Sequence, residues 1–172
     1  MAIAKPFNLQ KWIDENRDKL QPPVGAYQIN AESEDYITII VGGPNGRKDF
    51  HWEDGEELFY QIEGDMHVNI INEEGKRERI DIREGEMLLL PPRVPHSPQR
   101  PAGTVGLVVE RTRRDGEIDK LMWFCENCDE KLYEAGFPLK NLGVQIKAAI
   151  EQFMSSVDHR TCNNCGTIME KP

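Results

Sequence analysis

The chain has 172 residues, of which 38% are hydrophobic, and its formal net charge at neutral pH is −9. This length fills one core well but is too short for two ordinary domains with linkers, so we expect one domain with an appendage. Because the acidic excess repels a phosphate backbone, we expect no nucleic-acid partner. No segment resembles a signal peptide or a membrane span, so we expect a cytoplasmic protein without a membrane partner.

The first predicted element is a helix between residues 8 and 20. Leu9, Trp12, Ile13 and Leu20 follow helical spacing, and Asn8 is a suitable N-cap residue. The prolines that come next cannot continue a helix, so it should end there.

From about residue 26 to 111, short β-rich runs alternate with turn residues. The runs predicted to be strands are 36–41, 57–62, 66–71, 77–82, 87–90 and 104–110. Regular short strands with turn signals between them predict an antiparallel sandwich or barrel. With the N-terminal helix, this barrel should occupy residues 1–114 and contain the catalytic site.

The pattern of short β-rich runs stops after residue 114, and residues 115–172 are predicted to form a C-terminal appendage packed against the barrel. They contain two cysteine pairs and a helix expected between about residues 139 and 157. The apolar stripe of that helix consists of Leu142, Ile146, Ala149, Ile150 and Phe153.

Three residues of the barrel region have the character of metal ligands. Glu57 shares a strand face with Phe59, and if that face points inward, a carboxylate is aimed at the interior. A buried carboxylate is costly unless it is paired or bound to a metal. His51 and His96 could complete a set of two imidazoles and one carboxylate; the alternative is that both are ordinary loop histidines and Glu57 is surface charge.

The spacing around these residues resembles the two cupin motifs. His51 through Gly64 resembles the first motif, and Gly85, Pro91 and His96 resemble the second. Two positions depart from the pattern: the familiar His-x-His pair here ends in Glu53, and Arg93 stands where many cupins have glycine. The expected fold is therefore mainly β, a cupin jelly-roll barrel (double-stranded β-helix).

Three protein ligands on one side of a metal are the arrangement of non-haem Fe(II) oxygenases, because the opposite positions stay open. Arg47 and Arg100 lie close in sequence to the two histidines, and Glu110 ends an apolar strand. Buried guanidinium groups bind carboxylates bidentately, so two arginines here would indicate an anionic substrate. Equally, both arginines could decorate a turn and the barrel rim.

The four cysteines form two C-x-x-C pairs, a strong metal signal in a chain without an export signal. They are Cys125, Cys128, Cys162 and Cys165. Tetrahedral thiolate ligation suits iron and zinc alike. Four sulfur ligands leave no place for substrate, which favours a structural role over a catalytic one; free thiols or a transient redox pair are the alternative.

Six short segments of the sequence together resemble the 3-hydroxyanthranilate 3,4-dioxygenase family, and the likeness extends over residues 7–165. The segments that carry the resemblance are 41–45 (VGGPN), 57–61 (ELFYQ), 90–92 (LPP), 96–100 (HSPQR), 108–111 (VVER) and 123–125 (WFC). The resemblance implies ring cleavage of 3-hydroxyanthranilate by O2 to 2-amino-3-carboxymuconate 6-semialdehyde, in the kynurenine route to quinolinate and NAD. It also suggests a rubredoxin-like iron site at the cysteines and a homodimer.

Residue roles follow from the same resemblance. It makes His51, Glu57 and His96 the Fe(II) ligands. Arg100 would clamp the substrate carboxylate, Arg47 would assist near the reacting face, and Glu110 would bond the substrate's amino or hydroxyl side and could accept a proton. The apolar walls would be Phe59, Val24, Pro98 and Val109. Ala26 replaces an asparagine common in the family, which bears on substrate affinity.

Two other functions remain open from the residues. One is a different small-acid cupin enzyme, such as a thiol dioxygenase or an isomerase, on the same three ligands. The other is a cupin binding domain without turnover. Oxygen uptake with 3-hydroxyanthranilate would distinguish the ring-cleaving dioxygenase from these alternatives, because only the dioxygenase predicts it.

Overall fold

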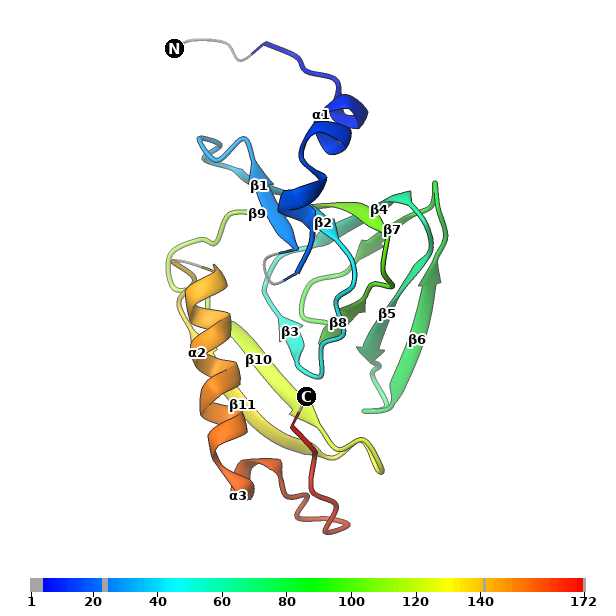
Figure 1. Ribbon diagram of the computed structural model, residues 1–172. Coiled ribbons are helices and arrows are strands. Elements are labelled where there is room, and N and C mark those ends of the chain that lie inside the picture. The colour runs from blue at the N-terminus through cyan, green and yellow to red at the C-terminus, as the bar shows by residue number, and fades with distance from the viewer. Residues whose placement is uncertain (1–4, 23–24, 141, 172) are drawn as a thin grey trace.

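The computed structural model describes residues 5–22, 25–140 and 142–171, and shows two antiparallel sheets facing each other (Figure 1). The first sheet has the strand order β1-β2-β9-β4-β7 and the second β11-β10-β3-β8-β5-β6. The strands of the first sheet are β1 (Ala26–Ile29), β2 (Tyr36–Gly42), β4 (Glu57–Glu63), β7 (Met87–Leu90) and β9 (Val105–Arg111). Those of the second are β3 (Phe50–Trp52), β5 (Met66–Ile71), β6 (Arg77–Ile82), β8 (His96–Gln99), β10 (Asp119–Phe124) and β11 (Lys131–Phe137).

The chain crosses repeatedly between the sheets as it runs from β2 to β9. This puts β2-β9-β4-β7 in one sheet and β3-β8-β5-β6 in the other, which is the strand order of a jelly roll. The predicted mainly β, cupin-type barrel is confirmed.

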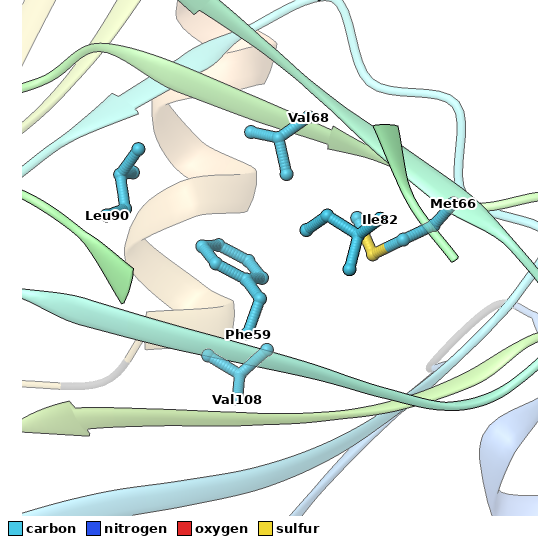
Figure 2. Close-up of a cluster of buried hydrophobic side chains, with 6 residues drawn as sticks. All are labelled: Phe59, Met66, Val68, Ile82, Leu90 and Val108. Carbon is cyan, nitrogen blue, oxygen red and sulfur yellow. The ribbon is translucent and has the colours of Figure 1, made fainter. Parts of the chain in front are cut away.

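Strand β4 shows how the sequence sets the inner face. Glu57, Phe59 and Gln61 are buried, while the intervening side chains are half-buried; this is the period-2 alternation expected from the sequence. Figure 2 shows Phe59 within a cluster of buried apolar side chains. This cluster consists of Phe59, Met66, Val68, Ile82, Leu90 and Val108. Phe59 and Val108 of this cluster also line the cavity of the candidate site.

The N-terminal segment is helical but not one helix. Helix α1 (Leu9–Glu15) begins with the Asn8 side chain accepting from the Lys11 backbone N–H, and a short 3-10 helix follows at Arg17–Leu20. Its two halves are separated at Asn16, whose side chain donates to a backbone carbonyl of α1. Ile13 of α1 and Leu20 of the 3-10 helix are buried in an apolar cluster on the outside of the first sheet.

The segment after residue 114 is joined to the barrel by main-chain pairing. Strand β10 pairs with β3, placing Leu121 opposite His51, and β11 pairs with β10. Helices α2 (Leu142–Ser155) and α3 (Val157–Arg160) follow; α2 packs along this extension of the sheet (Figure 1). Neither β10 nor β11 was predicted, and the division of the chain at residue 114 stays a prediction. No helix in the described part of the chain is long and apolar enough to cross a membrane.

The contact that fixes α2 is aromatic. Phe153 is fully buried and its ring stacks on Trp123 of β10, with centroids 4.4 Å apart. We expect Phe153→Ala to lower the free energy of unfolding by about 3–5 kcal/mol, because the change leaves a cavity between α2 and the sheet. Denaturant unfolding measures this, with the exposed neighbour change Gln152→Ala as the control. Equal unfolding midpoints for the two variants would contradict this packing.

Candidate active site

The three predicted metal ligands lie together at the open end of the barrel. His51 is on β3, Glu57 begins β4 and His96 begins β8, and the two histidines face each other across the β3–β8 pair. Their candidate ligand atoms all lie within 4.8 Å of one another. The exposed fractions are 7% for His51, 8% for Glu57 and 2% for His96. The structure thus brings together residues that are 45 positions apart in sequence.

The contact between His96 and Glu57 favours a metal over a plain hydrogen bond. His96 Nδ1 bonds the Val94 carbonyl at 2.9 Å, which turns Nε2 toward Glu57 Oε2 at 2.7 Å. This contact lacks the alignment of a hydrogen bond, and among the described residues no donor is aligned with the buried Oε2. An unsatisfied buried carboxylate oxygen is costly, and a cation between the two atoms removes the cost. Two imidazoles and a carboxylate suit a divalent transition metal.

In the absence of a metal, the two groups perturb each other. Burial opposes the charged forms, but the Glu57 carboxylate raises the pKa of His96 and His96 lowers the pKa of Glu57. Because a metal requires the neutral imidazole and the carboxylate, metal binding competes with protonation of His96.

His51 is oriented by a carboxylate from the C-terminal segment. Its Nε2 lies 2.7 Å from Oδ2 of Asp119, which is buried at the start of β10. Burial raises the pKa of Asp119, but its bonds with His51 and Arg113 outweigh this and lower it. With Nε2–H donating to this carboxylate, the lone pair of a neutral His51 is on Nδ1. A carboxylate that supports the far side of the ring is common for metal-bound imidazoles.

Arg113 holds together the acids around the ligands. Its side chain is 6% exposed and contacts three carboxylates: Asp119 through Nε and Nη2 at 2.7 and 2.8 Å, Glu110 at 2.9 Å and Glu53 at 2.6 Å. Burial lowers the pKa of Arg113, but these acids raise it above its ordinary value overall. Arg113 therefore stays charged and compensates a group of acids that would otherwise repel one another.

Glu53 has the most altered acidity of that group. Glu53, Glu57 and Glu110 present oxygens within 4.8 Å of one another, and Glu57 lies opposite Glu110 in the β4–β9 pair. Burial and the charge of Glu110 raise the pKa of Glu53 to about 10, against the opposing effect of Arg113. Glu53 therefore depends on its contact with Arg113 to carry a charge in this group. It occupies the position of the missing cupin histidine.

Sequence reasoning noted Glu53 only as a departure from a motif, and it missed Arg113 and Asp119. The replacement of an expected histidine by an acid was a usable signal. Asp119 carried none, because it lies beyond the last predicted strand and meets His51 only through the unpredicted β10.

A cavity of about 590 Å³ opens over the three ligand residues. Of the residues predicted to line it, Arg47, Arg100, Glu110, Phe59 and Pro98 do so. Val24 lies outside the described residues. Ala26, which the sequence resemblance linked to substrate affinity, also lines the cavity. The lining from helix α2, Ile146 and Ile150, was not predicted.

Val109 is a correction: the wall residue of β9 is Val108. Val108 and Glu110 line the cavity, and the alternation of side chains puts Val109 on the other face of β9. Its partners in the neighbouring strands, Thr38 and Leu58, are likewise absent from the lining.

The two cavity arginines differ in how their charge is compensated. Arg47 forms an ion pair with the buried Asp49. Arg100 has no carboxylate in ion-pair contact among the described residues, although it is only 3% exposed. Its burial lowers its pKa to about 10. The charge of Glu57 acts in the opposite direction, although its carboxylate does not contact Arg100. Among the described residues, Arg100 is therefore a buried guanidinium with no carboxylate in contact.

The second predicted metal site is also assembled. The four cysteines present sulfurs within 4.8 Å of one another, with Cys125–Cys165 and Cys128–Cys162 Sγ distances of 3.6 Å. In both pairs a backbone N–H of the fifth residue returns to the first cysteine's carbonyl, as in Gly166 to Cys162. The arrangement is suited to one tetrahedral metal ion.

The chain was compared with known families and proteins. A family model described as "3-hydroxyanthranilic acid dioxygenase" matches residues 1–154. The 3-hydroxyanthranilate 3,4-dioxygenase of Bacillus cereus is 48% identical over 163 residues, covering 95% of this chain and 90% of that protein. The enzyme of the same name from Xanthomonas euvesicatoria pv. vesicatoria is 47% identical over 170 residues, covering 99% and 95%.

Among solved structures, protein NMB1881 from Neisseria meningitidis is 24% identical with a TM-score of 0.48, covering 63% of this chain and all of that one. An RmlC-like cupin from Shewanella frigidimarina is 18% identical with a TM-score of 0.40, covering 52% and 77%.

The support that Asp119 gives to His51 predicts a change in metal affinity. We expect Asp119→Asn to weaken Fe(II) binding at the barrel site by roughly 10–100-fold, because the isosteric amide no longer supplies a charged acceptor for the ring N–H. Anaerobic Fe(II) titration measures this, with Asp115→Asn in the exposed loop before β10 as the control. An unaltered dissociation constant in Asp119→Asn would show that this contact does not support the ligand.

Proposed function

The chain belongs to the 3-hydroxyanthranilic acid dioxygenase family, and from this premise we propose that it cleaves the ring of 3-hydroxyanthranilate with O2. Both oxygen atoms enter the 3,4 bond, and the product is 2-amino-3-carboxymuconate 6-semialdehyde. The observation that carries the proposal is the combination in one cavity of three candidate metal ligands and the buried guanidinium of Arg100, which no carboxylate of the described residues contacts. An aromatic acid with neighbouring hydroxyl and amino groups satisfies both.

In this proposal His51, Glu57 and His96 hold iron(II). The support is the donor set and the buried Glu57 oxygen that lacks a donor among the described residues. When bound, iron(II) supplies the open coordination positions and the electron-transfer chemistry that allow O2 to react with an aromatic ring.

Arg100 binds the substrate carboxylate and so fixes which edge of the ring faces the ligand residues. Arg47, whose guanidinium is held by Asp49, assists from the same cavity. Planar guanidinium groups match a carboxylate with two parallel hydrogen bonds, which sets the ring orientation as well as the affinity.

Glu110 is the proposed proton acceptor for the substrate hydroxyl. It lines the cavity next to Glu57, and Arg113 holds its Oε2 at 2.9 Å. The phenolic proton passes to a carboxylate oxygen of Glu110, which requires a hydrogen-bond distance in the complex. Phe59, Val108 and Pro98 keep bulk water away from the reacting ring.

We assign the four cysteines a second metal ion with a structural role. Iron in a rubredoxin-like site is the proposed ion, and zinc also suits four thiolates. We also propose that the protein acts in the cytoplasm as a homodimer. Support for the dimer comes from edge strand β7, where Met87 and Leu89 are exposed.

The direct test loads the protein with Fe(II) anaerobically and then adds 3-hydroxyanthranilate and air. We expect consumption of one O2 per substrate and the absorbance of the semialdehyde product. L-Cysteine supplied instead should consume no oxygen. Oxygen uptake with the thiol but not with the aromatic acid would replace this proposal by a thiol dioxygenase.

Removal of the carboxylate anchor should weaken substrate binding. We expect Arg100→Ala to cost roughly 2–5 kcal/mol of binding free energy, because a buried charge pair loses one partner. The Michaelis constant for 3-hydroxyanthranilate measures this, and Arg83→Ala on the exposed turn before β7 is the control. An unchanged Michaelis constant in Arg100→Ala would remove this residue from substrate binding.

If the thiolate site is structural, loss of its metal ion should not abolish the activity. We expect Cys162→Ala to lose the second metal ion and to retain at least part of the turnover, since the closed site offers no position for substrate. Metal analysis and oxygen uptake on the same preparation measure both. Complete loss of activity with the barrel iron still bound would speak against a purely structural role.

A further inference from the structure

Arg100 meets a neutral partner inside the barrel. Its Nη1 donates to Oε1 of Gln61 at 2.8 Å, and both side chains are almost fully buried, Gln61 at 1% and Arg100 at 3% exposure. A buried arginine is ordinarily paired with a carboxylate, since an uncompensated buried charge is costly. An amide satisfies one N–H of the guanidinium but leaves its charge in place.

The amide of Gln61 is fixed in the orientation this requires. Its Nε2 donates to the Glu63 backbone carbonyl at 3.0 Å, so the oxygen, and not the nitrogen, faces Arg100. Its backbone is held by Glu86 and Gly85, whose carbonyl and N–H it bonds at 3.0 and 2.8 Å. Gln61 is the last residue of β4 before the β4–β9 pairing shifts register.

The guanidinium of Arg100 packs directly against the backbone of Gly106. Gly106 is the residue opposite Gln61 in β9. A Cβ placed on Gly106 would lie 2.5 and 2.9 Å from the two terminal nitrogens of Arg100, and 2.8 Å from Gln61 Oε1. A carbon atom does not come this close to atoms it is not bonded to, so a side chain at this position would require Arg100 and Gln61 to move. The backbone of Gly106 is ordinary strand, so alanine at this position changes the space and not the chain conformation.

We infer that Gln61 and Gly106 are positioning residues that determine substrate specificity: they hold the Arg100 guanidinium in the cavity with no carboxylate of the described residues in contact with it, and so make the pocket selective for aromatic rings that carry a carboxylate. The inference rests on the proposed function, since it takes the ligand to be a carboxylated ortho-aminophenol. It adds a reason for the selectivity that the identity of Arg100 alone does not give.

The physical basis is competition for one charge. A carboxylate at position 61 would pair with Arg100 inside the barrel and leave little attraction for a ligand carboxylate. The neutral amide aligns the guanidinium and leaves that attraction to the ligand. In a cavity shielded from water, the interaction is much stronger than at the surface. A ligand without the carboxylate leaves the charge uncompensated and is rejected.

The test compares two ligands that share the hydroxyl and amino groups. Dissociation constants for 3-hydroxyanthranilate and for 2-aminophenol, which lacks the carboxylate, are measured by calorimetry on the anaerobic Fe(II)-loaded protein. The ratio of the two constants reports selectivity for the carboxylate. The variants are Gln61→Glu, Gln61→Leu and Gly106→Ala. The controls are Gln152→Glu, which adds the same charge on the exposed face of α2, and Gly46→Ala, where a Cβ meets open space.

We expect Gln61→Glu to lower the ratio by on the order of tenfold or more, with a smaller loss in Gln61→Leu. A purely structural role gives the opposite order, because glutamate keeps the acceptor that leucine removes. Gly106→Ala should also lower the ratio by displacing the guanidinium. The 2-aminophenol constant should change by less than about threefold in all three, and both controls should match the parent.

The outcomes separate this inference from the proposed function. If the parent protein does not prefer the carboxylated ligand, or if Arg100→Ala keeps the preference, the role proposed for Arg100 fails. If Arg100→Ala abolishes the preference but Gln61→Glu is no worse than Gln61→Leu, only the inference is overturned. Thermal unfolding identifies variants that do not fold, and in that case Gly106→Ala decides the question, since an unchanged ratio there overturns the inference as well.

Discussion

The ion pairs of Arg113 with Glu53, Glu110 and Asp119 are the interactions on which the candidate site depends most. These acids come from the β3–β4 connection, from β9 and from β10, and Glu57 adds a further carboxylate within 4.8 Å of two of them. Such a concentration of buried acids is unfavourable without a central cation, and removal of one partner from a buried charge network costs about 3–5 kcal/mol. Arg113 therefore makes it possible for Glu57, the proposed metal ligand, and Glu110, the proposed proton acceptor, to lie side by side.

The same network explains why the C-terminal segment belongs to the site. Asp119 and Leu121 of β10 lie against His51, one through its side chain and the other through strand pairing. Helix α2 then covers the outside of the cavity with Ile146 and Ile150, and its Phe153 locks the helix onto Trp123 of β10. The cysteine pairs lie on either side of this unit in the sequence, at residues 125–128 and 162–165. A metal bound by them would fasten its two ends.

The sequence was sufficient where chemistry is local. Motif spacing and period-2 alternation placed His51, Glu57 and His96 together, and the C-x-x-C spacing placed the four cysteines together. Alternation from Glu110 would also have indicated Val108, and the assignment to Val109 came from resemblance instead. Contacts between distant segments were out of reach: Arg113 with Glu53, and Asp119 with His51, depend on how β9 and β10 are brought to β3. To predict the Arg100–Gln61 contact, one would have to know that Gln61 points into the barrel and that Gly106 lies opposite it.

The burial of Arg100 within an acidic molecule has a consequence for how an anion reaches it. The chain carries a formal charge of −9, so an anionic ligand in dilute buffer meets repulsion before it meets the guanidinium. At physiological ionic strength the Debye length is about 8 Å, and dissolved ions mask most of that outer field. Inside the cavity the attraction acts over a few ångströms, which is shorter than this screening length, so salt weakens it less. Salt therefore hastens capture of the ligand and has little effect on how long it stays bound.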